Sequence, residues 1–129
     1  MVEIEQANEA YIKSLSTLPG YVAIEDGGII GFIAVKNHNL VASEIHIIAV
    51  EPSWHRHGVG RALVNRVEQD IRKDGIVLLQ VKTLGPSDPY DGYRLTRKFY
   101  EELGFLPLEE TTKIQGTKQL CIIMVKYLL

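Results

Sequence analysis

Hydrophobic residues recur along this chain of 129 residues with two different periods, and the period separates the expected helices from the expected strands. Spacings of three and four residues predict helices over 4–17, over 58–73 and over 95–103. Runs rich in β-branched and aromatic residues predict strands at 21–25, 29–36, 43–50, 76–82, from 105 onward and at 119–129. Asp26-Gly27-Gly28 is typical of a tight hairpin turn, and Gly75 and Gly104 are placed to end the second and third helices.

The order of these elements predicts an α/β fold of the mixed (α+β) type. A strand at 43–50, a crossover helix and a strand at 76–82 imply a parallel pair of strands. We therefore expect a mostly antiparallel sheet with that parallel pair at its centre, flanked by helices. The strand at 76–82 is almost entirely apolar at its centre, so burial on both faces is expected. The loop at 83–92 is long, as functional loops often are.

Composition narrows the function classes. Hydrophobic residues make up 46% and charged residues 23% of the chain, which is typical of a globular protein and leads us to expect one domain over 1–129. The net charge of −2 gives no electrostatic footprint for nucleic acid, so any anion site must be local. No nucleic-acid partner is expected.

The number of cysteines and the length of the apolar segments indicate where in the cell the protein is expected. Cys121 is the one cysteine, so no internal disulfide can form and no Cys/His cluster suits structural zinc. The longest apolar run, 120–125, is far too short to span a bilayer, and the acidic start is unlike a signal peptide. We expect a cytoplasmic protein with no membrane partner. His46, His55 and His57 lack helical ligand spacing, so no metal is expected either.

Candidate chemistry gathers where the 43–50 strand leads into the next helix. Gly58-Val59-Gly60 opens that helix, where unpaired backbone N–H groups and the helix dipole favour an anion. The positively charged or ionisable side chains beside this turn belong to Arg56, His57 and Arg61. A tight turn with solvated charges is the alternative. Neither the phosphate-binding loop of nucleotide triphosphatases nor the third glycine of a dinucleotide site is present.

Two motifs resemble those of the GNAT family of N-acetyltransferases. The family's acetyl-CoA signature, Pro-x-x-[Gln/Arg]-x-x-Gly-x-[Gly/Ala], matches the segment 52–60 through Pro52, Gly58 and Gly60, with His55 where Gln or Arg is usual. The family's Tyr-x-x-x-Gly-Phe block matches Tyr100 to Phe105. Tyr93 stands where an asparagine is common. The resemblance covers about residues 20–129, and it implies that the family's first strand is missing here.

The resemblance implies transfer of an acetyl group from acetyl-CoA, as cosubstrate, to a primary amine in a ternary complex. The pyrophosphate would lie on the N–H groups of Arg56, His57, Gly58, Val59, Gly60 and Arg61. The pantetheine arm would pair with the strand edge at Ile48, Ala49 and Val50, exposed because the family's two central strands splay apart. A backbone N–H of that strand can also hold the oxyanion.

The acceptor amine must lose a proton before it attacks the thioester. Strand alternation places Glu44, His46, Ile48 and Val50 on one face, and the family carries bases at the positions of Glu44 and His46. An ordinary polar strand face is the alternative. Gln80 stands where some members place a glutamate base, but an amide cannot accept the proton.

Tyr100 is the candidate general acid for the departing thiolate. The alternative is a packing role beside the stripe of Leu95, Phe99 and Leu103.

Tyr90, Asp91 and Tyr93 are candidates for the acceptor site. A non-catalytic acyl-CoA-binding module is the competing function. The strand at 119–129 is apolar on both faces for most of its length, which favours a homodimer.

Overall fold

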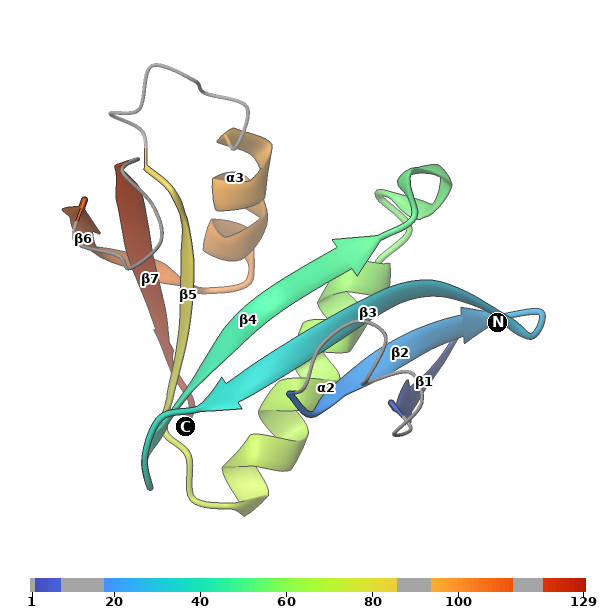
Figure 1. Ribbon diagram of the computed structural model, residues 1–129, viewed down its shortest axis with the longest axis horizontal. Helices are drawn as coiled ribbons and strands as arrows, with labels where there is room; N and C mark the ends of the chain where they lie inside the picture. Colours follow the sequence, from blue (N-terminus) through green and yellow to red (C-terminus); the bar gives the residue numbers. More distant parts are fainter. Residues whose placement is uncertain (1, 8–17, 86–93, 113–119) are drawn as a thin grey trace.

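The computed structural model describes residues 2–7, 18–85, 94–112 and 120–129. These residues form a seven-stranded sheet in the order β1-β2-β3-β4-β5-β7-β6 (Figure 1). The strands are β1 Glu3–Gln6, β2 Gly20–Glu25, β3 Gly28–Asn37, β4 Ala42–Val50, β5 Leu78–Leu84, β6 Leu106–Thr111 and β7 Cys121–Tyr127. The described helices are the short 3-10 helix η1 Pro52–Trp54, α2 Val59–Lys73 and α3 Arg94–Glu102.

The chain begins differently from the expectation. Residues 3–6 form a strand, β1, which pairs antiparallel with β2 from Glu3 opposite Ile24 to Gln6 opposite Tyr21. The helix over 4–17 is therefore wrong at its start, and residues 8–17 lie outside the described part. The expectation that the first strand is missing is wrong too. Pairing with the edge of β2 gives the backbone N–H and C=O groups of this short segment hydrogen-bond partners. This outweighs the weak helical spacing of its apolar residues.

The next four strands confirm the predicted connections. The β2–β3 hairpin turns at Asp26 and Gly27, whose φ angles of 50° and 79° are those of a two-residue turn with both residues left-handed. β3 and β4 are antiparallel, α2 crosses over, and β4 and β5 form the parallel pair. The mixed, mostly antiparallel sheet with one parallel pair is thus confirmed.

β4 and β5 pair over only part of their length. Their parallel register runs from Ala42 opposite Leu78 to Ile45 opposite Val81 and stops there. β4 continues along β3 to Val50, whereas β5 continues along β7 to Leu84. The two central strands therefore diverge from one end of the sheet, as Figure 1 shows. No other described strand pairs with the β5 side of β4 beyond Ile45, and we call this side the free edge of β4.

A β-bulge in β4 changes the faces expected from simple alternation. Ile45 pairs with Val35 and Ile47 with Ala34, so His46 is an extra residue without a partner on β3. Directly opposite residues share a face, which places Ile48 with Ile33 and Glu44 with Lys36. The prediction that Glu44, Ile48 and Val50 share one face is therefore wrong, since the bulge moves Glu44 to the other face.

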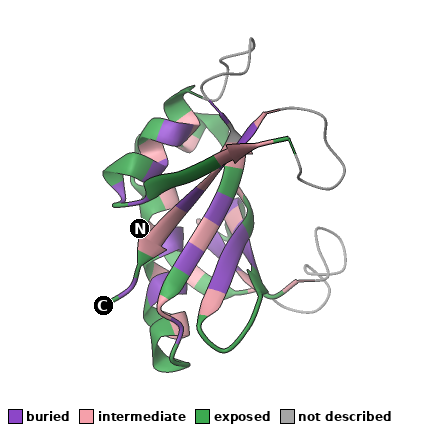
Figure 2. Ribbon diagram, turned by 90° about the vertical axis from the view of Figure 1, so that its left-hand side faces the viewer, coloured by how far each residue is buried: buried purple, intermediate pink, exposed green. Residues whose placement is uncertain are grey.

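The core lies between the sheet and the two helices. α2 buries Val59, Leu63, Val64 and Val67 against the same cluster as Ile33 and other sheet residues (Figure 2). Ile48 and Val50 pack against this cluster from β4. We call this side of the sheet the helix face and the opposite side the open face.

β5 shows the difference between the two faces. It begins at Leu78, two residues later than predicted, and buries Leu79 and Val81 on the helix face. Leu78 and Lys82 are exposed, so the expected burial of this strand on both faces is wrong. Leu78, Leu106 and Tyr127, which are all exposed on neighbouring strands, are called the open-face patch.

The last helix and the cysteine complete the core. α3 ends before Gly104, as predicted, but its buried residues are Arg97 and Tyr100, while Leu95 is exposed. The predicted stripe is thus confirmed at Phe99 and Leu103, which pack in the core, and is wrong at Leu95. Cys121 is buried and free, as expected for a packing residue. Within the described ranges, no helix is long and apolar enough to cross a membrane.

Candidate functional site

The start of α2 presents backbone donors. Gly58 is the N-cap residue with a left-handed φ of 78°, and Arg56 is also left-handed at 65°. Ala62 N–H already bonds the carbonyl of Gly58, but the N–H groups from Gly58 to Arg61 bond no described residue. A Cβ on Gly58 would meet nothing within 4 Å, so the space at this turn is open. The turn therefore offers several converging donors to an anion.

Gly60 has a different role from Gly58. A Cβ on Gly60 would lie 3.0 Å from Cζ of Phe99 and 3.9 Å from Cγ2 of Val50. The glycine thus lets α2, α3 and the end of β4 come together. This junction brings the helix start beside the edge of β4 that carries Ile48, Ala49 and Val50, and next to α3.

Two histidines make contacts that stabilise the turn between β4 and α2. The His55 ring Nε2 lies 2.9 Å from the carbonyl oxygen of Val50, and because a carbonyl only accepts, Nε2–H donates. The ring of His57 stacks edge-on against Trp54 with centroids 5.3 Å apart. His55 therefore ties the turn to β4 at the position where the GNAT signature has Gln or Arg.

Glu44 is the most strongly contacted candidate. Its side chain is 8% exposed, and its Oε1 lies 2.6 Å from His38 Nε2, 3.2 Å from Gln80 Nε2 and 3.3 Å from Lys82 Nζ. His46 is exposed and joins no hydrogen bond or ion pair among the described residues. The structure thus groups Glu44 with His38 on the open face and leaves His46 apart, at the bulge.

Tyr100 lies on the other side of the sheet. It is 3% exposed within the core, with its ring edge-on to Phe99 and to Phe105 at centroid distances of 5.2 Å and 5.4 Å. Burial raises the pKa of its hydroxyl to about 12. The hydroxyl therefore stays protonated across the physiological range, where it can donate a hydrogen bond as well as accept one.

Sequence comparison decides the family. A model of the acetyltransferase (GNAT) domain matches residues 17–107, which is more than half of the chain. The chain belongs to the GNAT family. Among curated proteins, none matches the sequence of this GNAT chain.

Solved structures agree with this assignment. A GNAT-family protein from Desulfovibrio desulfuricans is 26% identical with a TM-score of 0.76, over 86% of this chain and 69% of that one. Ard1 from Thermoplasma volcanium is 16% identical with a TM-score of 0.83, over 99% and 98%. A GNAT acetyltransferase from Elizabethkingia anophelis with acetyl-CoA bound is 17% identical with a TM-score of 0.76, over 98% of each chain. The fold of this protein is that of the GNAT acetyltransferases, and its family is one of acyltransferases.

The sequence assigned a role to none of the three partners of Glu44 in this GNAT protein, and it excluded Gln80 as a base. Gln80 and Lys82 carried a usable signal, because they are the polar residues that alternate within the apolar β5, and Gln80 lies opposite Glu44 in the parallel register. His38 carried none, since it belongs to the connection between β3 and β4. Tyr90, Asp91 and Tyr93 lie outside the described residues.

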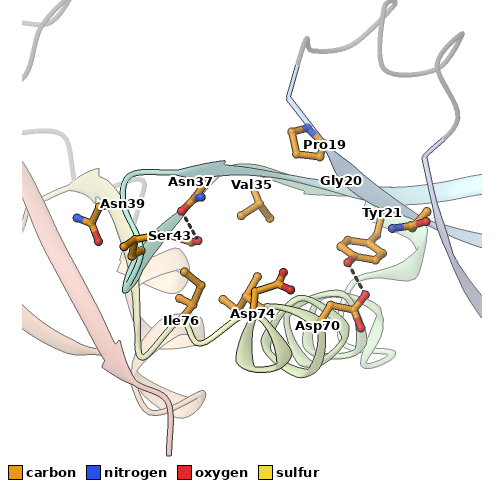
Figure 3. A pocket seen from close by; sticks show the side chains of 13 residues that line it. Pro19, Gly20, Tyr21, Val35, Asn37, Asn39, Ser43, Asp70, Asp74 and Ile76 are labelled. Atoms are coloured by element: carbon orange, nitrogen blue, oxygen red, sulfur yellow. Dashed lines mark hydrogen bonds between the residues drawn. The ribbon is translucent and has the colours of Figure 1, made fainter.

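A hollow of about 290 Å³ lies elsewhere, between the C-terminal half of α2 and the starts of β2 and β4 (Figure 3). Its polar lining is already paired, for example Tyr21 with Asp70 at 2.5 Å and Ser43 with Asn37 at 3.4 Å. It is at the far end of α2 from Gly58 and does not belong to the candidate site. Across the described ranges, no three His, Cys, Asp or Glu side chains are grouped so as to hold a metal ion.

Proposed function

We propose that this GNAT protein is an N-acetyltransferase that moves an acetyl group from acetyl-CoA to a primary amine of a small molecule or peptide. The observation that carries the proposal is the adjacency of two features. The donors at the start of α2 lie directly beside the free edge of β4, where β4 and β5 diverge. A helix N-terminus suits a pyrophosphate, and a free strand edge suits the amide-bearing pantetheine arm.

Acetyl-CoA would then occupy both features at once. The N–H groups near Gly58 and the positive charges of Arg56 and Arg61 would take the phosphates. The pantetheine arm would run along Ile48 to Val50, with the thioester near the point where β5 leaves β4. The acetyl-CoA seen in the Elizabethkingia anophelis protein of the same fold supports this cosubstrate.

The candidate base and acid lie on opposite faces of the sheet. Glu44 is on the open face, whereas Tyr100 is in the core on the helix face, and His46 stands apart at the bulge. An amine could therefore approach the thioester from one side while the sulfur departs on the other. The amine nitrogen bonds the carbonyl carbon, the C–S bond breaks, Glu44 or His46 takes the amine proton, and the sulfur leaves as CoA thiolate.

Tyr100 would assist that departure by donating a hydrogen bond to the sulfur. With its pKa raised to about 12, full proton transfer to a thiolate of ordinary pKa near 8.5 is uphill. A hydrogen bond to a charged acceptor still contributes about 1.5–3 kcal/mol. Solvent would then supply the proton that converts the thiolate to the thiol.

A CoA-release assay tests the proposal. The full chain is incubated with acetyl-CoA and each of spermidine, lysine, tyramine, kanamycin and short peptides with a free N-terminal amine or a lysine. Release of CoA that depends on one of the amines, with the acetylated amine detected by mass spectrometry, supports it. Saturable acetyl-CoA binding by calorimetry without any turnover would support the acyl-CoA-binding module instead. A cytoplasmic location, as expected from the sequence, remains part of the proposal.

A further inference from the structure

The contacts of Glu44 are unevenly divided between its two oxygens. Oε1 is contacted by an imidazole, a primary amide and an ammonium group, from His38, Gln80 and Lys82. Oε2 has no hydrogen-bond partner among the described residues, and it is not among the fully buried unpaired atoms. One carboxylate oxygen therefore makes all three contacts, which leaves Oε2 as the oxygen that can accept a proton from a substrate or a water molecule.

The three donors come from two separate parts of the chain. His38 lies just after β3, whereas Gln80 and Lys82 are two residues apart on β5, on the face that Glu44 occupies on β4. An ionised carboxylate only accepts hydrogen bonds, so the Nε2 of His38 must carry the hydrogen at 2.6 Å. Three donors from two parts of the chain restrict the rotation of the carboxylate more than one donor could.

We propose that His38 is a positioning residue that, with Gln80 and Lys82, holds Glu44 by Oε1 so that Oε2 receives the proton of the acceptor amine. This inference rests on the proposed function. It assigns the base role to Glu44 rather than to His46, because no described residue holds His46 in one orientation.

His38 makes the shortest of the three contacts. Its Nε2 lies 2.6 Å from Oε1 of Glu44, whereas the nitrogens of Gln80 and Lys82 lie 3.2 Å and 3.3 Å away. Because short hydrogen bonds to a charged acceptor are the strong ones, loss of the His38 donor should disturb the carboxylate most.

Two substitutions of His38 separate positioning from simple packing. His38→Gln keeps a donor but cannot become charged, whereas His38→Leu removes the donor. With acetyl-CoA and whichever amine of the stated panel the wild type acetylates, His38→Leu should lower kcat at least tenfold and leave the KM for acetyl-CoA within about twofold. His38→Gln should restore most of that loss at pH 8. Gln69→Ala, on the exposed side of α2, is the matched control and should keep the wild-type kcat and KM.

Rescue by glutamine gives a readout that a packing role would not move, because leucine and glutamine fill similar space and differ in the hydrogen-bond donor. Full kcat in a folded His38→Leu variant, or a His38→Gln variant as slow as His38→Leu, overturns the inference while leaving the proposed function intact. No turnover by the wild type with any amine of the panel rejects both.

Discussion

Gly58 and Gly60 stand two residues apart in one motif, yet the structure predicts that alanine will harm them for different reasons. Gly58 needs its left-handed φ of 78°, whereas its missing Cβ has open space around it. Gly60 is inside the first turn of α2 with no positive φ, but its missing Cβ faces Phe99. One substitution strains the backbone, and the other pushes two helices apart.

The two costs can be sized from the structure. A left-handed alanine costs about 1–2 kcal/mol, so Gly58→Ala should destabilise the protein by that amount. In Gly60→Ala the new methyl group lies 3.0 Å from Cζ and 3.2 Å from Cε1 of Phe99, well inside the optimum carbon separation of about 3.5–4.0 Å. Overpacking costs about 1–3 kcal/mol, against a gain of about 0.5–1 kcal/mol from a better helix former. Each variant should therefore melt a few degrees lower, at about 3–5 °C per kcal/mol.

A second substitution distinguishes the two mechanisms. Phe99→Leu removes the ring that Gly60→Ala collides with, so the double variant should recover about 1 kcal/mol relative to the sum of the single effects. The same Phe99→Leu change should leave the cost of Gly58→Ala unaltered. The assay is urea unfolding of the two double-mutant cycles, with acetyl-CoA affinity measured by calorimetry. Equal coupling of Phe99 to both glycines would refute the reasoning, and wild-type acetyl-CoA affinity in a folded Gly58→Asp variant would refute the anion site.

Four further outcomes are expected. Tyr100→Phe should lower kcat about tenfold or more with little change in acetyl-CoA affinity, and full activity with a lowered Tm would show that the hydroxyl has only a structural role. Lys126 bonds both oxygens of the buried Glu68 at 3.0 Å and 2.9 Å, so Lys126→Met should cost about 2–4 kcal/mol in urea unfolding, and Glu68→Gln should relieve part of that loss in the double variant. The hydrogen bond from Tyr21 lowers the pKa of Asp70. The stability that ionised Asp70 contributes is therefore present above the ordinary carboxyl pKa and is lost as the pH falls through the lowered pKa, so Asp70→Asn should lower Tm more at pH 7 than at pH 2.5. The open-face patch should be covered in a homodimer, and a monomer mass by light scattering at micromolar concentration would contradict that.

The elements that the sequence predicts well are those with strong local signals. The hairpin followed from Asp26 and Gly27, which tolerate the left-handed angles that the turn requires. α2 followed from its apolar stripe and from Gly75, whose φ of 85° ends the helix. The parallel pair then followed from the strand–helix–strand order. For the hairpin and for α2, the neighbouring residues alone decide the conformation.

The features that the sequence missed depend on distant partners. β1 contains one apolar residue, Ile4, between polar ones, and only the free edge of β2 makes it a strand. The group around Glu44 unites residues six and 36 positions away, His38 and Gln80. Local periodicity carries no information about such contacts, because they depend on the register between strands that are far apart in the sequence.

The bulge at His46 links the hydrophobic core to the candidate chemistry. In a regular β4, Glu44 would share the helix face with Ile48 and Val50, and a buried carboxylate there would lie among apolar side chains on the same side as Tyr100. A one-residue slip would instead expose the half-buried Ile48 and Val50, where full burial of such a side chain contributes about 1.5–3 kcal/mol. One unpaired residue, at the point where β4 leaves β5, resolves this conflict. It keeps the apolar side chains on the core at both ends of the strand while placing Glu44 on the open face, across the sheet from Tyr100.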